Sequence, residues 1–203
     1  MLEAEFTKRL NSFVLNAKLK GEGWTCVTGK NGSGKTTLLN CLSGIYQIDS
    51  GFIKLDGLDI SRLPLEKRGF VLVNPNTYIP SLSVDEHIRW GFRLKKIEVK
   101  EEELQKVKQA LGINFEGRVS KLSVGQRIRV SLATALLAQP KAILVDEAFS
   151  NISEKQSFLK EFKTLTKERR IMVIYTTQEI DDSRFSEYHY HIEDGVLKAL
   201  KQV

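Results

Sequence analysis

The sequence predicts an α/β fold built on a mostly parallel β-sheet. Short apolar runs bounded by turn residues alternate with longer stretches whose apolar residues recur at helical spacing. Strands that alternate with helices are typical of parallel sheets. The 203 residues, 41% hydrophobic and 28% charged, suit one or two domains with a real core.

The expected elements follow this alternation along the chain. Strands are expected at residues 2–6, 13–19, 24–28, 52–55, 70–73, 142–145, 171–175, 188–192 and 196–200. Helices are expected at residues 35–43, about 84–95, 101–111, 126–138 and 154–168.

Three local features refine this order of elements. The two earliest strands are expected to pair antiparallel, and the last two are expected to be joined across Asp194 and Gly195. Pro140 closes the fourth helix, because proline cannot continue it. Residues 76–130 are mostly helical without a strong strand. We therefore expect one domain over 1–203, with a core of about 1–75 and 131–203 and an inserted helical subdomain of about 76–130.

Composition and charge exclude several classes of protein. No apolar run approaches the roughly 18 residues that span a bilayer, and the N-terminus (MLEAE) lacks the pattern of a signal peptide. A cytoplasmic chain is expected, whose membrane association would go through a partner. Cys26 and Cys41 are too few for a zinc site and are expected to be buried. The net charge of +6 comes from lysines interleaved with glutamates, so no direct binding of nucleic acid is expected.

Residues 29–36 (GKNGSGKT) match the phosphate loop G-x-x-x-x-G-K-[ST] in full. Its glycines let the backbone N–H groups face the phosphates of a nucleoside triphosphate, and the helix that begins there directs its positive end at them. Lys35 would place its charge at the β- and γ-phosphates, and Thr36 would offer its hydroxyl to Mg²⁺. The expected nucleotide-binding residues are Gly29, Asn31, Gly32, Ser33, Gly34, Lys35, Thr36 and Thr37.

A second motif lies at residues 142–147 (AILVDE), an apolar run that ends in two acids. Carboxylates at the carboxyl end of a parallel strand lie where ligands bind in such sheets. Asp146 is expected to hold Mg²⁺ through a water. Glu147 is expected to act as the general base that polarises an attacking water.

A third motif makes a family resemblance specific. Residues 122–126 (LSVGQ) lead into an Arg-rich helix, then Pro140 and the Asp146-Glu147 strand. This order resembles the signature of ABC-type ATPases over essentially the whole chain, which implies a RecA-like P-loop NTPase core that binds ATP with Mg²⁺.

In that family two chains pair head to tail around two ATP molecules. Each ATP is held by the phosphate loop of one chain and the signature of the other. By this resemblance Ser123 offers a hydroxyl, Gly125 an N–H at close approach, and the helix that starts near Gln126 its positive end, all to the γ-phosphate.

The chain departs from the family pattern at several positions. Asn74 takes the place of the usual Gln, where it would approach the metal with shorter reach, and Ser153 takes the place of the usual Asp. Gln178 replaces the usual His at the γ-phosphate. Losing a charge-assisted hydrogen bond costs roughly 1–2 kcal/mol, or about 5- to 30-fold, so slow turnover is predicted. The remaining departures are Val124 for Gly and Ala148 for Pro.

The family also stacks an aromatic side chain on adenine. The nearest register places Leu10 there, and Phe6 and Phe13 are the alternatives.

Residues 56–69 and 78–88 look like the ATPase subunits of prokaryotic importers, most like the archaeal molybdate/tungstate type. The resemblance implies an ATP-hydrolysing subunit that powers a membrane transporter, peripheral on the inner face of the cell membrane. Its partners would be a second ABC ATPase chain and an integral membrane subunit, whose coupling helix would fit a groove around residues 74–83.

Two other functions stay open at this point. One is a weakly hydrolysing module that forms the degenerate half of an asymmetric ABC pair. The other is a soluble ABC ATPase acting on DNA or ribosomes, which the lack of a coiled-coil insertion or a second ATPase domain disfavours. The sequence leaves open the transported solute, import or export, and homodimer or heterodimer.

Overall fold

The structure, a computed structural model, describes residues 1–201. Over these residues the strands form one mixed sheet in the order β5-β4-β1-β2-β10-β9-β3-β8-β7-β6. The strands are β1 (Leu2–Leu10), β2 (Phe13–Gly21), β3 (Trp24–Thr28), β4 (Ser50–Leu55), β5 (Leu58–Asp59), β6 (Phe70–Val73), β7 (Ala142–Asp146), β8 (Met172–Thr177), β9 (Tyr188–Glu193) and β10 (Val196–Lys201).

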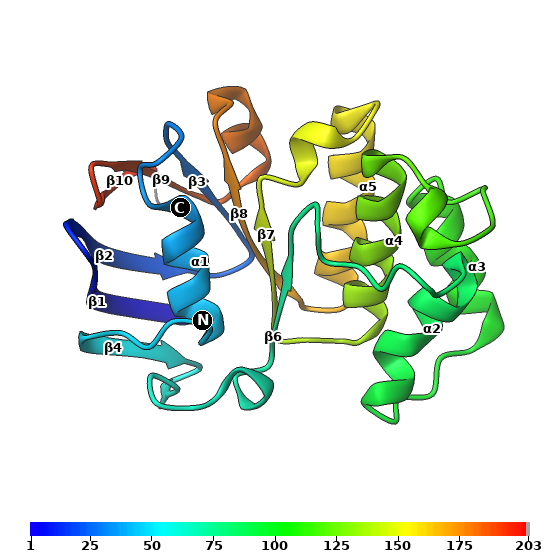
Figure 1. The fold of residues 1–203 in the computed structure, drawn as a ribbon, viewed down its shortest axis with the longest axis horizontal. Coiled ribbons are helices and arrows are strands. Elements are labelled where there is room, and N and C mark those ends of the chain that lie inside the picture. Colours follow the sequence, from blue (N-terminus) through cyan, green and yellow to red (C-terminus); the bar gives the residue numbers. More distant parts are fainter. Residues whose placement is uncertain (202–203) are drawn as a thin grey trace.

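The helices lie on both sides of this sheet (Figure 1). The α-helices are α1 (Lys35–Ser43), α2 (Val84–Leu94), α3 (Glu101–Ala110), α4 (Val124–Leu137) and α5 (Lys155–Glu168). Short 3₁₀ helices are η1 (Leu65–Lys67), η2 (Val119–Lys121), η3 (Phe149–Asn151) and η4 (Ile180–Phe185). In Figure 1, α1 lies between the antiparallel strands and the parallel ones, while α4 and α5 cover the opposite face and α2 and α3 lie farther out.

The parallel strands β9, β3, β8, β7 and β6 form one side of the sheet, with β6 at its edge. Every residue of β3, β7 and β8 is buried, which fits their apolar sequences and the helices on both faces. In this register Thr28 lies beside Thr177, and Asp146 lies beside Thr176. The carboxyl end of β3, which leads into the phosphate loop, therefore lies at the same edge of the sheet as the carboxyl end of β7, which ends in Asp146.

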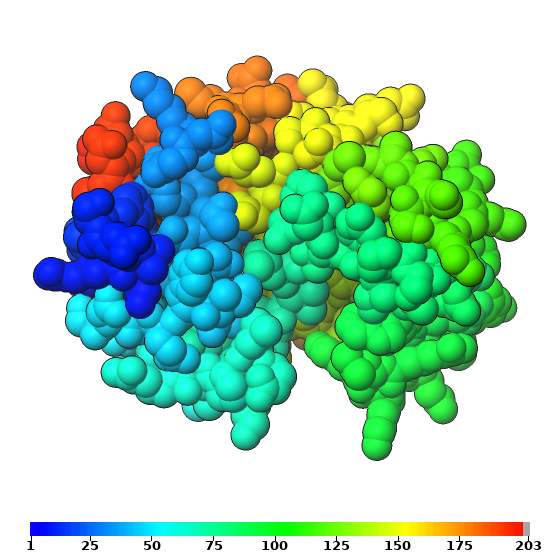
Figure 2. Space-filling model, viewed as in Figure 1, coloured from blue at the N-terminus to red at the C-terminus, as the bar shows by residue number. Residues whose placement is uncertain are grey.

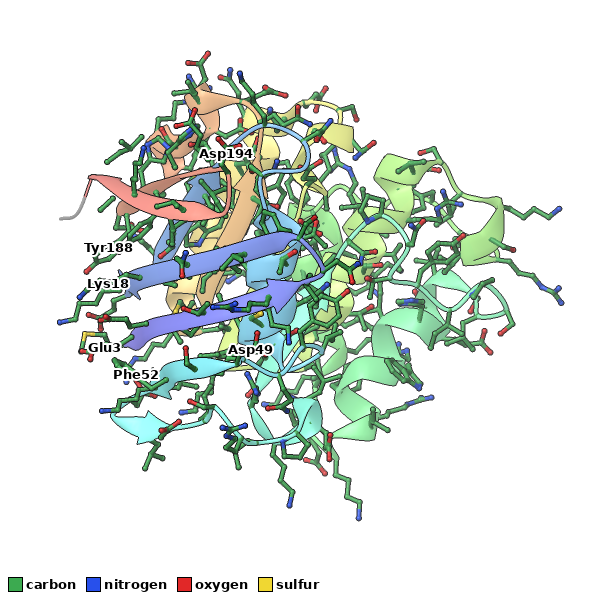
Figure 3. All side chains as sticks on the ribbon, turned by 60° about the vertical axis from the view of Figure 1, so that its left-hand side comes forward. Glu3, Lys18, Asp49, Phe52, Tyr188 and Asp194 are labelled. Carbon is green, nitrogen blue, oxygen red and sulfur yellow. The ribbon has the colours of Figure 1, made fainter. Side chains whose placement is uncertain are left out.

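The antiparallel part is formed by β1, β2, β4 and β5, as expected for the two earliest strands. Its outer face carries alternating charges, and Figure 3 shows Glu3 on β1 and Lys18 on β2 among them. Glu5 pairs with Lys18 at 2.9 Å and Glu3 with Lys20 at 3.3 Å directly across the strands. Exposed cross-strand pairs of this kind contribute little stability, so the burial of the inner face dominates.

Two apolar clusters fill the two faces of the sheet. One packs α1 against β1, β2 and β4. The other packs α2 to α5 around Trp24, whose ring lies 5.5 Å from Tyr175 and stacks at 6.1 Å on Phe149. The expected strands and helices are confirmed within a few residues, apart from the two-residue β5, which was not predicted. None of the helices in residues 1–201 is long and apolar enough to cross a bilayer.

Arg68 fixes the carboxyl end of α1, although its side chain was not singled out in the sequence. The guanidinium is 1% exposed and donates to the carbonyls of Cys41, at 2.8 Å, and Leu42, at 3.0 Å. It also donates to the carbonyls of Ser61 and Leu63. A cation at a helix C-terminus offsets the negative end of the helix dipole. Arg68 therefore anchors the carboxyl end of α1, whose amino end adjoins the phosphate loop.

Both cysteines are buried and free, as predicted. Burial raises the pKa of Cys26 and of Cys41 to about 12 each, so both thiols stay protonated. They pack as small apolar residues.

One helix boundary differs from the prediction. Helix α4 begins at Val124, earlier than the residue near Gln126 that was expected. The reason is a capping box: the Gln126 N–H donates to Ser123 Oγ at 3.2 Å, and the Ser123 N–H donates to Gln126 Oε1 at 3.0 Å. The helix is continuous from 124 to 137, so it crosses the expected boundary between the helical subdomain and the core. That division of the chain stays a prediction.

A buried histidine joins α2 to α4 and makes stability depend on pH. His87 is 4% exposed, its Nδ1 lies 2.8 Å from Thr134 Oγ1, and its Nε2 has no hydrogen-bond partner among residues 1–201. Burial lowers the pKa of His87 from its ordinary 6.5. Protonation therefore favours the unfolded chain, and the free energy of unfolding should fall as pH drops through 6.5 and below.

The measurement is urea unfolding between about pH 7.5 and 5 for the wild type and for His87→Gln, which cannot titrate. The difference between the two slopes isolates His87 from the carboxylates. Identical pH dependence in both proteins would contradict this account.

Candidate functional site

The phosphate loop joins the carboxyl end of β3 to α1. Lys35, the first residue of α1, has a side chain that is 3% exposed. Its Nζ donates to the carbonyls of Gly29 and Lys30, at 2.8 Å each, and forms an ion pair with Glu147 Oε1 at 2.9 Å. A buried ammonium needs such partners, and phosphate oxygens could take the place of the carboxylate.

Thr36 and Asp146 meet beside this lysine. Thr36 Oγ1 donates to Asp146 Oδ2 at 2.7 Å, and Thr176 Oγ1 donates to the other carboxylate oxygen, Oδ1, at 2.8 Å. A hydroxyl oxygen and a carboxylate are hard oxygen donors of the kind that Mg²⁺ prefers. The residues present therefore fit the metal that the sequence predicts.

A pocket of about 640 Å³ opens over these side chains. It brings together most of the residues that the sequence predicted for nucleotide, metal and catalysis: Asn31, Gly32, Gly34, Lys35, Thr36, Thr37, Asn74, Asp146 and Glu147. The pocket is also lined by Leu10, Phe13, Pro75 and Asn76. Gly29 takes part through its carbonyl, which binds Lys35. Ser33 is buried, and among the described residues its Oγ has no hydrogen-bond partner.

Two of the three candidates for adenine stacking lie at this pocket. Leu10 and Phe13 both line it, whereas Phe6 is 3% exposed and packs inside the apolar cluster around α1, so that alternative is wrong. The Phe13 ring also lies directly over the phosphate loop. A Cβ at Gly34 would meet it at 2.7 Å, and Gly34 has φ 112°, so this position accepts only glycine.

Asn74 reaches the pocket with its side chain partly engaged. The Asn76 N–H donates to Asn74 Oδ1 at 2.8 Å, which closes a local turn. Asn74 lies in the same pocket as Asp146 and Glu147. Its role as a metal ligand stays a prediction.

Glu147 and Gln178 border a second hollow of about 270 Å³, together with Ser150, Thr176, Thr177 and Glu179. Glu147 follows β7 with φ 49°, a left-handed conformation that non-glycine residues adopt rarely. Its N–H donates to Thr176 Oγ1 at 3.0 Å, which fixes this turn. The side chain can therefore lie between the Lys35 pocket and the loop that carries Gln178.

The signature residues lie at the start of α4. Ser123 and Gln126 form the capping box, and Gly125 packs against the segment after β7, where a Cβ would meet the Asn151 carbonyl oxygen at 2.5 Å. This close approach requires glycine. Of the described residues that line the Lys35 pocket, none belongs to 123–126.

Thr176 was missed by the sequence reasoning. It holds Asp146 through Oδ1 and accepts from the Glu147 N–H, so it orients both acids. The signal was present in the polar end of an otherwise apolar strand (MVIYTT), at the edge where ligands bind in parallel sheets.

Comparisons with known proteins agree with this geometry. The model of the ABC transporter family matches residues 14–150. The molybdate/tungstate import ATP-binding protein WtpC of Archaeoglobus fulgidus is 32% identical over 186 residues, which cover 88% of this chain and 77% of that protein. The protein of the same name from Pyrococcus horikoshii is 35% identical over 164 residues, 77% of this chain and 48% of that one. The chain thus spans about half the length of this second relative.

Solved structures share the fold. A dimeric bacterial ABC transporter cassette superposes with a TM-score of 0.81 at 22% identity and covers 100% of this chain and 99% of that one. Sequence, fold and the assembled phosphate loop agree. The chain therefore belongs to the ABC transporter family and has the fold of its ATP-binding subunits.

Proposed function

We propose that this chain is the ATP-binding and ATP-hydrolysing subunit of an ABC importer. One observation carries the proposal: Lys35, Thr36, Asp146 and Glu147 converge at one edge of the parallel sheet, beside a pocket of about 640 Å³. A buried cation, a magnesium-type donor pair and a carboxylate are the groups that phosphoryl transfer to water requires.

Each side chain then has one task. Lys35 balances the charge of the β- and γ-phosphates and releases Glu147 from its ion pair. The freed carboxylate of Glu147 accepts the proton of the attacking water, a contribution of about 10²–10⁴ in rate. Thr36 and Asp146 would hold Mg²⁺, which neutralises phosphate charge when bound. Gln178, across the second hollow from Glu147, donates a neutral hydrogen bond to the γ-phosphate.

A second ABC ATPase chain completes the site in this proposal. Ser123, Gly125 and Gln126 lie at a helix start outside the Lys35 pocket, so they serve an ATP bound elsewhere. A head-to-tail pair would present the N–H groups of this helix start to the γ-phosphate held by the other chain. ATP then stabilises the pair, and hydrolysis lets the two chains separate. The equilibrium shifts because the contacts to ATP across the interface exist only in the paired state.

The partner in the membrane would bind the face between the core and α2. Figure 2 shows the surface hollowed between the segment around residues 60–70, in turquoise, and α2, in green. Trp90 and Leu94 are 45% and 68% exposed, and their spacing of four residues places both on one face of α2. We propose that a coupling helix of an integral membrane subunit binds here beside residues 74–83. With such a partner, we infer that the chain works in the cytoplasm, peripheral to the membrane.

The relatives guide the choice of solute. Those from A. fulgidus and P. horikoshii are named for molybdate/tungstate import. We infer import of an oxyanion of this kind for the transporter that this chain serves, with specificity residing in the other subunits. The comparisons give no support to the alternative of a degenerate half of an asymmetric pair.

Hydrolysis of Mg-ATP tests the proposal. Turnover per chain should rise with protein concentration, because each site needs the signature of a second chain. It should fall by at least about 10²-fold in Glu147→Gln, which loses the base while keeping the shape of the side chain. The measurement is steady-state phosphate release across protein concentration.

The same assay distinguishes a wrong assignment of the base from a requirement for a second, different ATPase chain. Hydrolysis that survives in Glu147→Gln would contradict the assigned base. ATP binding without turnover above the variant would contradict a competent homodimer and would indicate a second, different ATPase chain.

Gln178 gives an independent prediction. Because a neutral amide replaces a charged donor, Gln178→His should raise kcat by about 5- to 30-fold with little change in KM. Measuring both constants for Gln178→His and for Gln178→Ala separates the hydrogen bond from the space that the side chain fills. An unchanged kcat in Gln178→His would mean that another step limits turnover.

A further inference from the structure

An ion-pair cluster lies next to the proposed catalytic loop and has no part in the chemistry described above. Lys155, the first residue of α5, donates from Nζ to Glu179 Oε2 at 2.6 Å. It also contacts both carboxylate oxygens of Asp182, at 2.9 and 3.1 Å. The Asp182 side chain is 5% exposed, so Lys155 supplies the countercharge that a buried carboxylate requires.

The cluster holds both neighbours of Gln178. Thr177 Oγ1 donates to Asp182 Oδ2 at 2.9 Å, and the Glu179 N–H donates to Thr177 Oγ1 at 3.1 Å. Gln178 itself is exposed and borders the hollow that it shares with Glu147. The backbone that carries Gln178 is therefore fixed from both sides by groups that depend on Lys155.

Lys155 also comes shortly after residues 151–153, the segment that α4, the helix of the signature, contacts. Arg129 of α4 donates to the Ser153 carbonyl at 2.8 Å, and Gly125 packs against the Asn151 carbonyl. Within the chain, Lys155 lies two residues after Ser153. The structure thus forms a continuous series of contacts from the signature helix through residues 151–155 to the Gln178 loop.

We propose that Lys155 is a positioning residue for Gln178, and that it couples the segment after β7 to the γ-phosphate end of the site. This rests on the proposed function. Burial lowers the pKa of Lys155, but its hydrogen bonds to Glu179 and Asp182 outweigh this and raise the pKa overall. The ammonium therefore stays charged across the physiological range.

The test is a kinetic cycle with Lys155→Met and Gln178→Ala. Lys155→Met should lower kcat by about tenfold through misplacement of Gln178, with KM for ATP unchanged because the phosphate loop is intact. The loss should not exceed that of Gln178→Ala, and the double variant should match Gln178→Ala alone. Lys155→Arg, which keeps the charge, should restore kcat to within about twofold of the wild type.

Lys163 on the same helix provides a matched control. Its Nζ pairs with Glu187 at 2.8 Å and donates to the Phe185 carbonyl, so it also ties α5 to the chain after β8, but away from Gln178. Lys163→Met should lower the melting temperature as Lys155→Met does and leave kcat unchanged. Equal losses of kcat in both variants would reduce Lys155 to a structural role and overturn the proposal.

The remaining outcomes are also decisive. A Lys155→Met effect that persists in full in the Gln178→Ala background would overturn the proposal while leaving ATP hydrolysis intact. If Lys155→Met does not fold, Thr177→Val breaks the link to Asp182 without a buried unpaired charge and should give the same dependence on Gln178. Wild-type protein without Glu147-dependent hydrolysis would overturn the proposed function itself.

Discussion

A buried positive charge sets the constraint on which this structure depends. Lys35 is 3% exposed, and its ammonium is balanced by two main-chain carbonyls and by Glu147. Carbonyls alone do not neutralise a buried cation, so the chain must deliver an acid to this point. The strand that ends in Asp146 and Glu147 delivers it. The loop, the sheet register and the acidic pair therefore form one electrostatic unit that is poised for phosphate.

The parallel sheet makes this unit possible. Residues that are far apart in the sequence, Thr36, Asp146 and Thr176, meet only because β3, β8 and β7 run in the same direction in adjacent positions. Other side chains outside this edge of the sheet hold the elements of the site in position. Arg68 anchors the far end of α1, and Lys155 anchors the loop at Gln178. A rigid scaffold of this kind holds the reacting groups with little reorganisation.

Much of this was predictable from the sequence. Central strands are continuous apolar runs and the phosphate loop is a local motif, so the strand ending in Asp146, the helix starting at Lys35 and their meeting at one edge follow from pattern alone. Features that depend on distant contacts did not follow. Phe6 and Phe13 are equivalent in sequence, and only packing separates a core residue from one that lines the pocket. The polar end of the strand marks Thr176, but its partner Asp146 follows only from the order and register of the strands.

Calorimetric titration of Mg-ATP into the wild type, Lys35→Ala and Lys30→Ala tests the central claim most directly. Each variant removes one positive charge from the same loop, but Lys30 is exposed and Lys35 is buried against the acid. The account predicts that Lys35→Ala loses at least about tenfold in affinity, the value of a charged hydrogen bond, while Lys30→Ala binds as the wild type does. Wild-type affinity in Lys35→Ala would contradict the assignment of this pocket to the phosphates.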